Sequence, residues 1–172
     1  MNRHVVLVGL PGAGKSAVGR IVAQMMDVEF RDIDELIEKS EGSSIAEIFK
    51  NRGEPEFRRL EKLETERALV RSFAVIAPGG GWAAVEGNLD DLPHQTLCIY
   101  LKTTPRAAAA RVVGSGDRPL LNGSDILARL NDLLTHRQSF YERCEVTVST
   151  DGKTVREVAE EIVKLARHAT GG

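Results

Sequence analysis

The sequence has little of several features that define whole classes of protein. Only 2 of its 172 residues are cysteine, aromatic residues make up 5%, and the formal net charge is only −2. A chain without excess positive charge is not expected to bind nucleic acid or an anionic membrane surface. No apolar run approaches the roughly 18 residues needed to span a bilayer. No signal-peptide pattern precedes the first strand-like segment, so a cytoplasmic enzyme is the simplest expectation.

The two cysteines, Cys98 and Cys144, have no partner at CxxC-type spacing. This absence disfavours a disulfide or a redox role for either of them. Cys98 lies in an apolar run and is predicted to be a small buried hydrophobic residue.

Short apolar runs alternate with longer segments of helical periodicity. Strands are predicted at residues 5–8, 28–32, 73–77, 96–101 and 145–148, and helices at 16–26, 33–39, from 44, 54–71, 105–113, 126–141 and 154 to about 168. Capping boxes at Ser44/Glu47 and Thr154/Glu157 mark two of the helix starts. Strands separated by helices indicate parallel β-α-β units, and therefore one three-layer α/β domain over residues 1–172.

The segment from Gly9 to Ser16, GLPGAGKS, matches the phosphate-loop pattern GxxxxGK[ST] between a strand and a helix. Its glycines allow backbone N–H groups to point inward at phosphate oxygens, and the following helix adds its positive N-terminus. Lys15 would reach the β- and γ-phosphates, and the Ser16 hydroxyl would ligate magnesium. The pattern predicts a phosphotransferase that binds a nucleoside triphosphate with Mg²⁺.

Two carboxylates, Asp32 and Asp34, flank Ile33 where the second predicted strand ends. Ligands of open α/β sheets bind beyond the carboxyl ends of the strands. The pair could hold magnesium, orient a substrate hydroxyl, or both. An aspartate in front of Glu35 is also a good helix N-cap, and that alternative stays open.

Three arginines lie in segments of mixed charge. Arg58 belongs to the run GEPEFRRLE, Arg118 to a glycine-containing loop, and Arg137 to a predicted helix. Each of them alone is more often a structural residue on a solvated helix face than a functional one. The planar guanidinium nevertheless suits carboxylates and transferring phosphates, because it donates two parallel hydrogen bonds.

Together these motifs resemble the shikimate kinases, small enzymes of the nucleoside-monophosphate-kinase type. The resemblance covers nearly the whole chain and depends on five features in order: GLPGAGKS, Asp32-Ile33-Asp34, GEPEFRR from Gly53, Gly79-Gly80-Gly81, and RPLL from Arg118 with Arg137 beyond it. It implies a P-loop kinase with a five-stranded parallel sheet in the order 2-3-1-4-5. It also implies a substrate-binding segment at about 33–61, a lid at about 113–124, and the use of ATP, shikimate and Mg²⁺. A monomer is expected separately, because the protein is small and its sequence has no obvious interface signal.

The resemblance further implies a role for each matching residue. The catalytic residues would be Lys15, Asp34 and Arg118. The nucleotide would be bound by Gly12, Ala13, Gly14, Lys15, Ser16, Ala17, Arg111 and Arg118, with Arg111 packing on the adenine. Shikimate would be bound by Asp34, Arg58, Gly80, Gly81 and Arg137, and the metal by Ser16 and Asp32. Glu61 would support Arg58 from one helical turn further along.

Three positions depart from the family pattern. Ile33 stands where threonine is usual, Pro78 where leucine is usual, and Trp82 where a small residue is common. Ile33 is expected to face away from the site. Trp82 is interpreted as a core aromatic, with a narrowing of the substrate site as the alternative.

Other functions fit part of the pattern. A gluconate-kinase-like or adenylate-kinase-like enzyme would share the phosphate loop, and so would a non-catalytic nucleotide-dependent binding protein. A GTPase is disfavoured because the chain has no Asn-Lys-x-Asp element.

Overall fold

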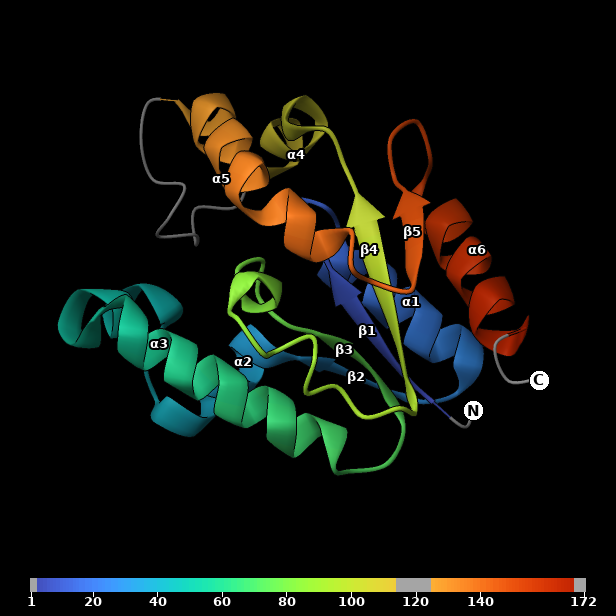
Figure 1. The fold of residues 1–172 in the computed structure, drawn as a ribbon, viewed down its shortest axis with the longest axis horizontal. Helices are drawn as coiled ribbons and strands as arrows, with labels where there is room; N and C mark the ends of the chain where they lie inside the picture. The colour runs from blue at the N-terminus through green and yellow to red at the C-terminus, as the bar shows by residue number, and fades with distance from the viewer. Residues whose placement is uncertain (1–2, 114–124, 169–172) are drawn as a thin grey trace.

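The computed structural model describes residues 3–113 and 125–168, and its centre is a five-stranded sheet that is parallel throughout (Figure 1). The strands are β1 (His4–Val8), β2 (Glu29–Asp32), β3 (Ala74–Ala77), β4 (Thr96–Lys102) and β5 (Val146–Ser149). Their spatial order is β2-β3-β1-β4-β5, so the predicted topology is confirmed. Parallel neighbours require crossover connections, which explains why helices separate most of the strands in the sequence.

The helices begin and end close to the predicted positions. They are α1 (Lys15–Met26), α2 (Ile33–Glu41), α3 (Ile45–Leu69), α4 (Pro105–Val112), α5 (Ile126–Tyr141) and α6 (Val155–His168), with a short 3₁₀ helix, η1 (Trp82–Ala84). Both predicted capping boxes are present, at the starts of α3 and α6. Within the described ranges, no helix combines the length and apolar character needed to cross a bilayer.

Helix α3 contains the break that the sequence predicted between a helix from residue 44 and a helix from residue 54. The kink lies at Gly53, whose φ of 81° and ψ of 170° are not helical. That conformation is essentially restricted to glycine. Pro55 follows immediately, and its missing N–H removes a helical hydrogen bond at the same place. The kink therefore separates α3 into the two helical segments that the sequence predicted.

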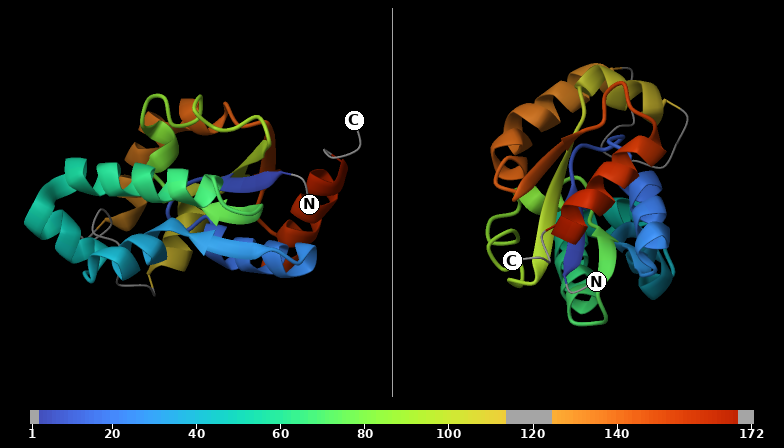
Figure 2. Two further views of the ribbon diagram at one scale, coloured as in Figure 1. Left: turned by 90° about the horizontal axis from the view of Figure 1, so that it is seen from below. Right: turned by 90° about the vertical axis from the view of Figure 1, so that its right-hand side faces the viewer.

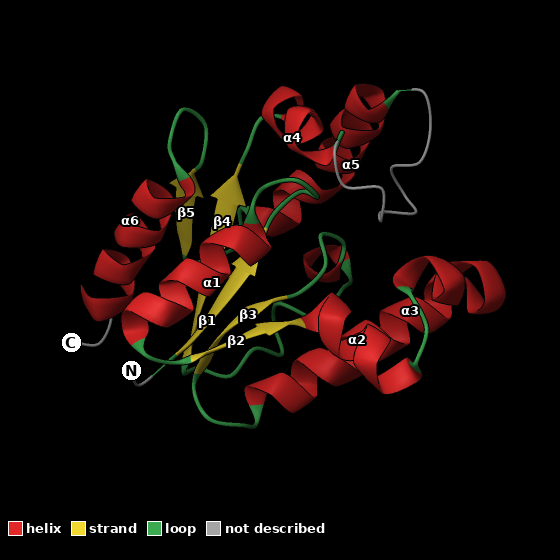
Figure 3. Ribbon diagram, turned by 180° about the vertical axis from the view of Figure 1, so that it is seen from behind, coloured by secondary structure: helices red, strands yellow, loops and turns green. Residues whose placement is uncertain are grey.

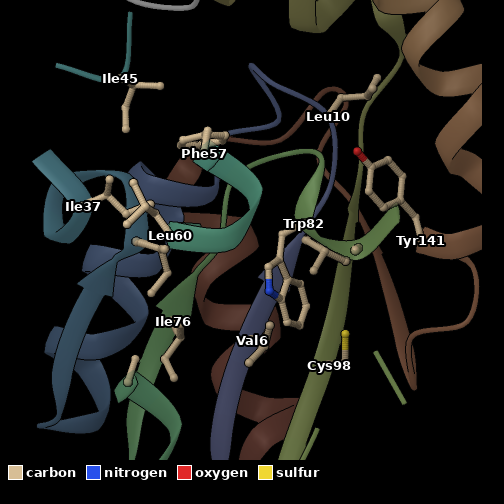
Figure 4. Packing of buried hydrophobic residues seen from close by; sticks show 14 of the residues in the cluster. Val6, Leu10, Ile37, Ile45, Phe57, Leu60, Ile76, Trp82, Cys98 and Tyr141 are labelled. Carbon is tan, nitrogen blue, oxygen red and sulfur yellow. The ribbon is translucent and has the colours of Figure 1, made fainter. Parts of the chain in front are cut away.

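The sheet lies between two layers of helices (Figures 2 and 3). Helices α1 and α6 cover one face, while α3, η1 and α5 cover the other. Alternate residues of β1 serve the two faces: Val5 packs with the α1 and α6 side, and Val6 packs in the cluster of Figure 4 that contains Trp82 and Tyr141. Since both faces of β1 are buried, the all-apolar sequence of that strand is explained.

All five strands run in the same direction, so their carboxyl ends meet at one edge of the sheet. The phosphate loop follows β1, Asp32 ends β2, and the three glycines follow β3. Three motifs that are far apart in the sequence are thereby placed side by side, at the edge where α/β proteins bind their ligands.

Candidate active site

The loop between β1 and α1 forms a cradle for an anion. Gly12 and Gly14 have φ values of 81° and 90°, which residues with a side chain rarely adopt. A Cβ on Gly12 would also lie 2.6 Å from the carbonyl oxygen of Ala108, so glycine is required for α4 to approach the loop. Gly14 occupies the N-cap of α1 and has no side chain to cap the first amides. These amides and the positive end of the helix can therefore bind phosphate.

Lys15 is buried inside this loop, with only 7% of its surface exposed. Its Nζ donates hydrogen bonds to the carbonyl oxygens of Gly9, at 2.8 Å, and Leu10, at 2.9 Å. The loop backbone thus holds the ammonium group at the carboxyl end of β1. A buried charge in this position interacts strongly with a phosphate group, because little water screens it.

A cavity of about 280 Å³ opens beside the loop. Every predicted nucleotide-binding residue that the structure describes lines it, namely Gly12, Ala13, Gly14, Lys15, Ser16, Ala17 and Arg111. Arg111 is held there by hydrogen bonds from its Nη1 to the carbonyl oxygens of Gly12, at 3.2 Å, and Ala13, at 3.3 Å. The predicted lid lies outside the described residues apart from Val113, and Arg118 lies outside them entirely.

The far wall of the cavity comes from the segment after β5, which sequence reasoning left undetermined. Thr150, Lys153 and Val155 line the cavity there. The position of this turn in the sequence could have indicated its role, because a turn at the carboxyl end of a parallel strand lies on the ligand-binding edge of the sheet.

Ser16 and Asp32 are in direct contact, since the Ser16 Oγ donates to the Asp32 Oδ2 at 2.6 Å. The Asp32 Oδ1 accepts hydrogen bonds from the backbone N–H groups of Asp34 and Glu35, so Asp32 is also the N-cap of α2. Capping and a functional role are therefore compatible, because each uses a different oxygen. Two adjacent oxygen ligands fit Mg²⁺, which takes few protein ligands and completes its shell with phosphates and water.

Asp34 lies in the first turn of α2 and faces the three glycines. A Cβ on Gly79 would lie 3.4 Å from the Asp34 Oδ1 and would collide with Glu61. Ile33, in contrast, is fully buried in the core, as expected for the residue between the two aspartates. The absence of a side chain at Gly79 therefore lets both carboxylates approach the same space.

The Arg58 side chain extends from α3 toward the same glycine segment that Asp34 and Glu61 approach. Its Nη1 donates to the Glu61 Oε2 at 2.7 Å, and its Nη2 donates to the Glu54 Oε1 at 3.3 Å. A Cβ on Gly81 would collide with the guanidinium group, so the third glycine makes room for Arg58. The predicted support of Arg58 by Glu61 is present in the structure.

Arg137 comes from α5 and is 7% exposed. Burial raises the pKa of Glu61, and the charge of Arg137 opposes this increase by less than the charge of Arg58 does. Both arginines therefore act on the same carboxylate. Tyr141, one turn further along α5, donates a hydrogen bond from its hydroxyl to the carbonyl oxygen of Gly80. Burial raises the pKa of Tyr141 to about 12, so the hydroxyl keeps its proton. Helix α5 therefore carries Arg137 and also holds the glycine segment in place through Tyr141.

Tyr141 was missed by sequence reasoning. Only its spacing from Arg137 could have indicated a place in the site, because a residue four positions further along lies on the same face of the helix. Trp82, whose role was left open between core and site, is 3% exposed and packs in the core cluster of Figure 4.

Burial raises the pKa of Glu61 to about 7, against opposition from the charge and hydrogen bond of Arg58. Asp34 adds to the increase, and Arg137 opposes it. The side chain is fully buried, so removal from water dominates. Glu61 is thus a carboxyl group that takes up a proton near neutral pH.

We expect the stability of the protein to fall as the pH rises from about 4.5 to about 7, because the folded state binds the Glu61 proton more tightly than the unfolded chain does. The loss should be on the order of 3 kcal/mol and should level off above the folded-state pKa. Glu61→Gln should remove this part of the pH dependence, measured by urea unfolding at a series of pH values. The exposed Glu66→Gln on the same helix is the control. Parallel curves for wild type and Glu61→Gln would contradict the assignment.

Comparisons with known proteins were consistent with one another. A family model described as shikimate kinase matches residues 11–167. The chain is 38% identical over 162 residues to a shikimate kinase from Caldanaerobacter subterraneus subsp. tengcongensis, covering 94% of this chain and 95% of the relative. A solved shikimate kinase from Acinetobacter baumannii, in complex with shikimate, superposes with a TM-score of 0.92 at 32% identity, covering 97% of this chain and 94% of that one.

A gluconokinase from Sinorhizobium meliloti has the same fold. Its TM-score is 0.66 at 21% identity, and the match covers 99% of this chain and 95% of that one. Identity at this level shows the fold alone.

Proposed function

The chain belongs to the shikimate kinase family, and we propose that it transfers the γ-phosphoryl group of ATP to the 3-hydroxyl of shikimate. The products are ADP and shikimate 3-phosphate, an intermediate of aromatic amino-acid biosynthesis. One observation carries the proposal: a phosphate loop and a group of two arginines with an aspartate meet at one edge of the sheet. Gly80 links the two halves, because it packs against Pro11 of the loop and accepts the hydrogen bond of Tyr141.

The nucleotide half binds ATP in the cavity beside the loop. The amides at the start of α1 bind phosphate oxygens, and Lys15 places its charge beside the transferring group. The adenine packs between Arg111 and Val155, which both line the cavity. Ser16 and Asp32 would hold Mg²⁺, which when bound neutralises charge on the β- and γ-phosphates. Phosphoryl transfer depends on such positioning and charge neutralisation more than on covalent chemistry.

The acceptor half binds shikimate, a carboxylate with three hydroxyl groups. Arg58 and Arg137 grip the carboxylate, because each guanidinium can donate two parallel hydrogen bonds. Asp34 accepts the hydrogen bond of the reacting hydroxyl and directs its oxygen toward the γ-phosphate. The backbone N–H groups of Gly80 and Gly81 line the same space. The acceptor segment therefore corresponds to about residues 33–61 together with α5.

The remaining assignments follow from the resemblance. Arg118, on a lid at about residues 113–124, closes over the transferring phosphate and excludes water that would compete as acceptor. We also propose that the enzyme is monomeric and cytoplasmic, as expected from the sequence.

The test is ADP release from MgATP by the purified chain, with shikimate, gluconate or AMP as the acceptor. We expect shikimate alone to stimulate release and to yield a phosphorylated product of matching mass. Stimulation by gluconate or AMP instead would overturn the acceptor assignment. ATP binding with no acceptor-dependent release would indicate a non-catalytic nucleotide-binding protein.

A further inference from the structure

The two cysteines are 46 positions apart in the sequence and meet in the fold. The Cys98 Sγ lies 2.6 Å from the Cys144 Sγ, and both are free thiols. A disulfide bond is about 2.05 Å long, so only a small movement would be needed to form one. The CxxC spacing, whose absence disfavoured a disulfide, applies only to cysteines that are close in sequence. Here the fold brings β4 and the segment after α5 together, and with them the two thiols.

The two thiols occupy different environments. Cys98 lies in β4, is buried, and belongs to the core cluster shown in Figure 4. Cys144 is partly exposed and lies in the turn after α5, with its backbone N–H donating to the carbonyl oxygen of Tyr141 at 3.1 Å. They are also the only cysteines in the chain, so no other thiol can compete within the molecule.

We propose that Cys98 and Cys144 form a site of reversible oxidation, at which a hydroperoxide joins the two sulfurs in a disulfide between β4 and the end of α5. The proposal does not depend on the kinase assignment. In a reducing compartment the pair would remain as thiols and would form the bond only when oxidant is present.

The partly exposed thiol reacts first. The hydrogen bond to Cys144, together with burial, raises the pKa of Cys98, which disfavours its thiolate. The sulfur of Cys144 therefore attacks the peroxide, the O–O bond breaks, and the products are an Sγ–OH group and water. The sulfur of Cys98 then attacks Cys144 Sγ, the S–O bond breaks, and the hydroxyl leaves with the Cys98 proton as a second water. In sum, two thiols lose two electrons to one hydrogen peroxide, which is reduced to two waters.

The bond would close a loop that contains α4 and α5, and with them Arg111 and Arg137. Closing a loop of this length removes conformations from the unfolded chain and so stabilises the folded state. We expect the oxidised protein to unfold at a Tm higher by roughly 5–15 °C.

The test uses the full chain treated with hydrogen peroxide and then freed of it. We expect both titratable thiols to disappear, the intact mass to fall by two hydrogens, a peptide containing Cys98 to be linked to one containing Cys144, and the Tm to rise. Dithiothreitol should reverse all four changes. Cys144→Ser, which alters the partly exposed position, should show no peroxide-dependent rise in Tm. If Cys98→Ser does not fold, Cys144→Ser alone still decides the question.

Two results would overturn the proposal. One is a gain of oxygen by Cys144 while Cys98 remains titratable, and the other is linkage of separate chains on a non-reducing gel. An internal disulfide that forms without any rise in Tm would support the oxidation site and contradict only the expected stabilisation. None of these readouts depends on phosphoryl transfer, so the proposed function and this site fail separately.

Discussion

Replacing Lys15 with alanine is expected to lower kcat by roughly 10³-fold, which is the upper end of what removal of one positioned donor costs. The side chain is buried in the phosphate loop and is held there by the carbonyl oxygens of Gly9 and Leu10. Its charge therefore reaches the phosphates without the reorganisation that a flexible surface lysine would need. Because the charge matters most in the transition state, kcat should fall more than the affinity for ATP. Initial rates at saturating ATP and shikimate measure this effect.

The substitution removes one hydrogen bond to each of the Gly9 and Leu10 carbonyl oxygens, although Leu10 still accepts from the Ala13 N–H, so its effect on folding must be measured separately. Circular dichroism and the Tm provide that measurement. Lys164→Ala, at an exposed position of α6, is the matched control and should retain wild-type turnover. A folded Lys15→Ala enzyme with turnover within a few-fold of wild type would contradict the assigned role.

Replacing Arg137 with lysine is expected to raise the KM for shikimate by roughly 10²-fold and to change the KM for ATP little. Lysine keeps the positive charge but loses the planar fork, so it cannot donate two parallel hydrogen bonds to a carboxylate. Arg137 is 7% exposed, and water can therefore replace the lost contact only poorly. Steady-state kinetics with each substrate varied in turn separate the two KM values.

Arg143→Lys is the matched control for this experiment. Arg143 lies just beyond the C-cap of α5, is exposed, and pairs with Asp90 at the surface, where such pairs contribute little. Its kinetics should match wild type. A normal KM for shikimate in Arg137→Lys, or a change confined to ATP, would remove Arg137 from the carboxylate grip.

Local patterns determined most of the secondary structure. The all-apolar β1, the two capping boxes and the phosphate-loop glycines each act over a few neighbouring residues, so they could be recognised in the sequence. The break inside α3 was placed in the same way, because Pro55 favours the first turn of a new helix and the non-helical residue is Gly53.

The roles of individual site residues depended on the fold to different degrees. The sequence offered the aspartate in front of Glu35 as an N-cap, whereas the structure places the cap at Asp32, whose two oxygens face different partners. The pairing of Glu61 with Arg58 follows from helical spacing, but the complete burial that raises its pKa depends on the glycine segment packed over it.

The sequence by itself determined the fold class, the phosphate loop and the family, because each depends on residue types at short, regular spacing. Only the tertiary structure decided which distant groups meet. Tyr141 reaches Gly80 across 61 positions, and Cys98 reaches Cys144 across 46. No local rule encodes such encounters, since they arise from the order of parallel strands and from the helices that cross between them.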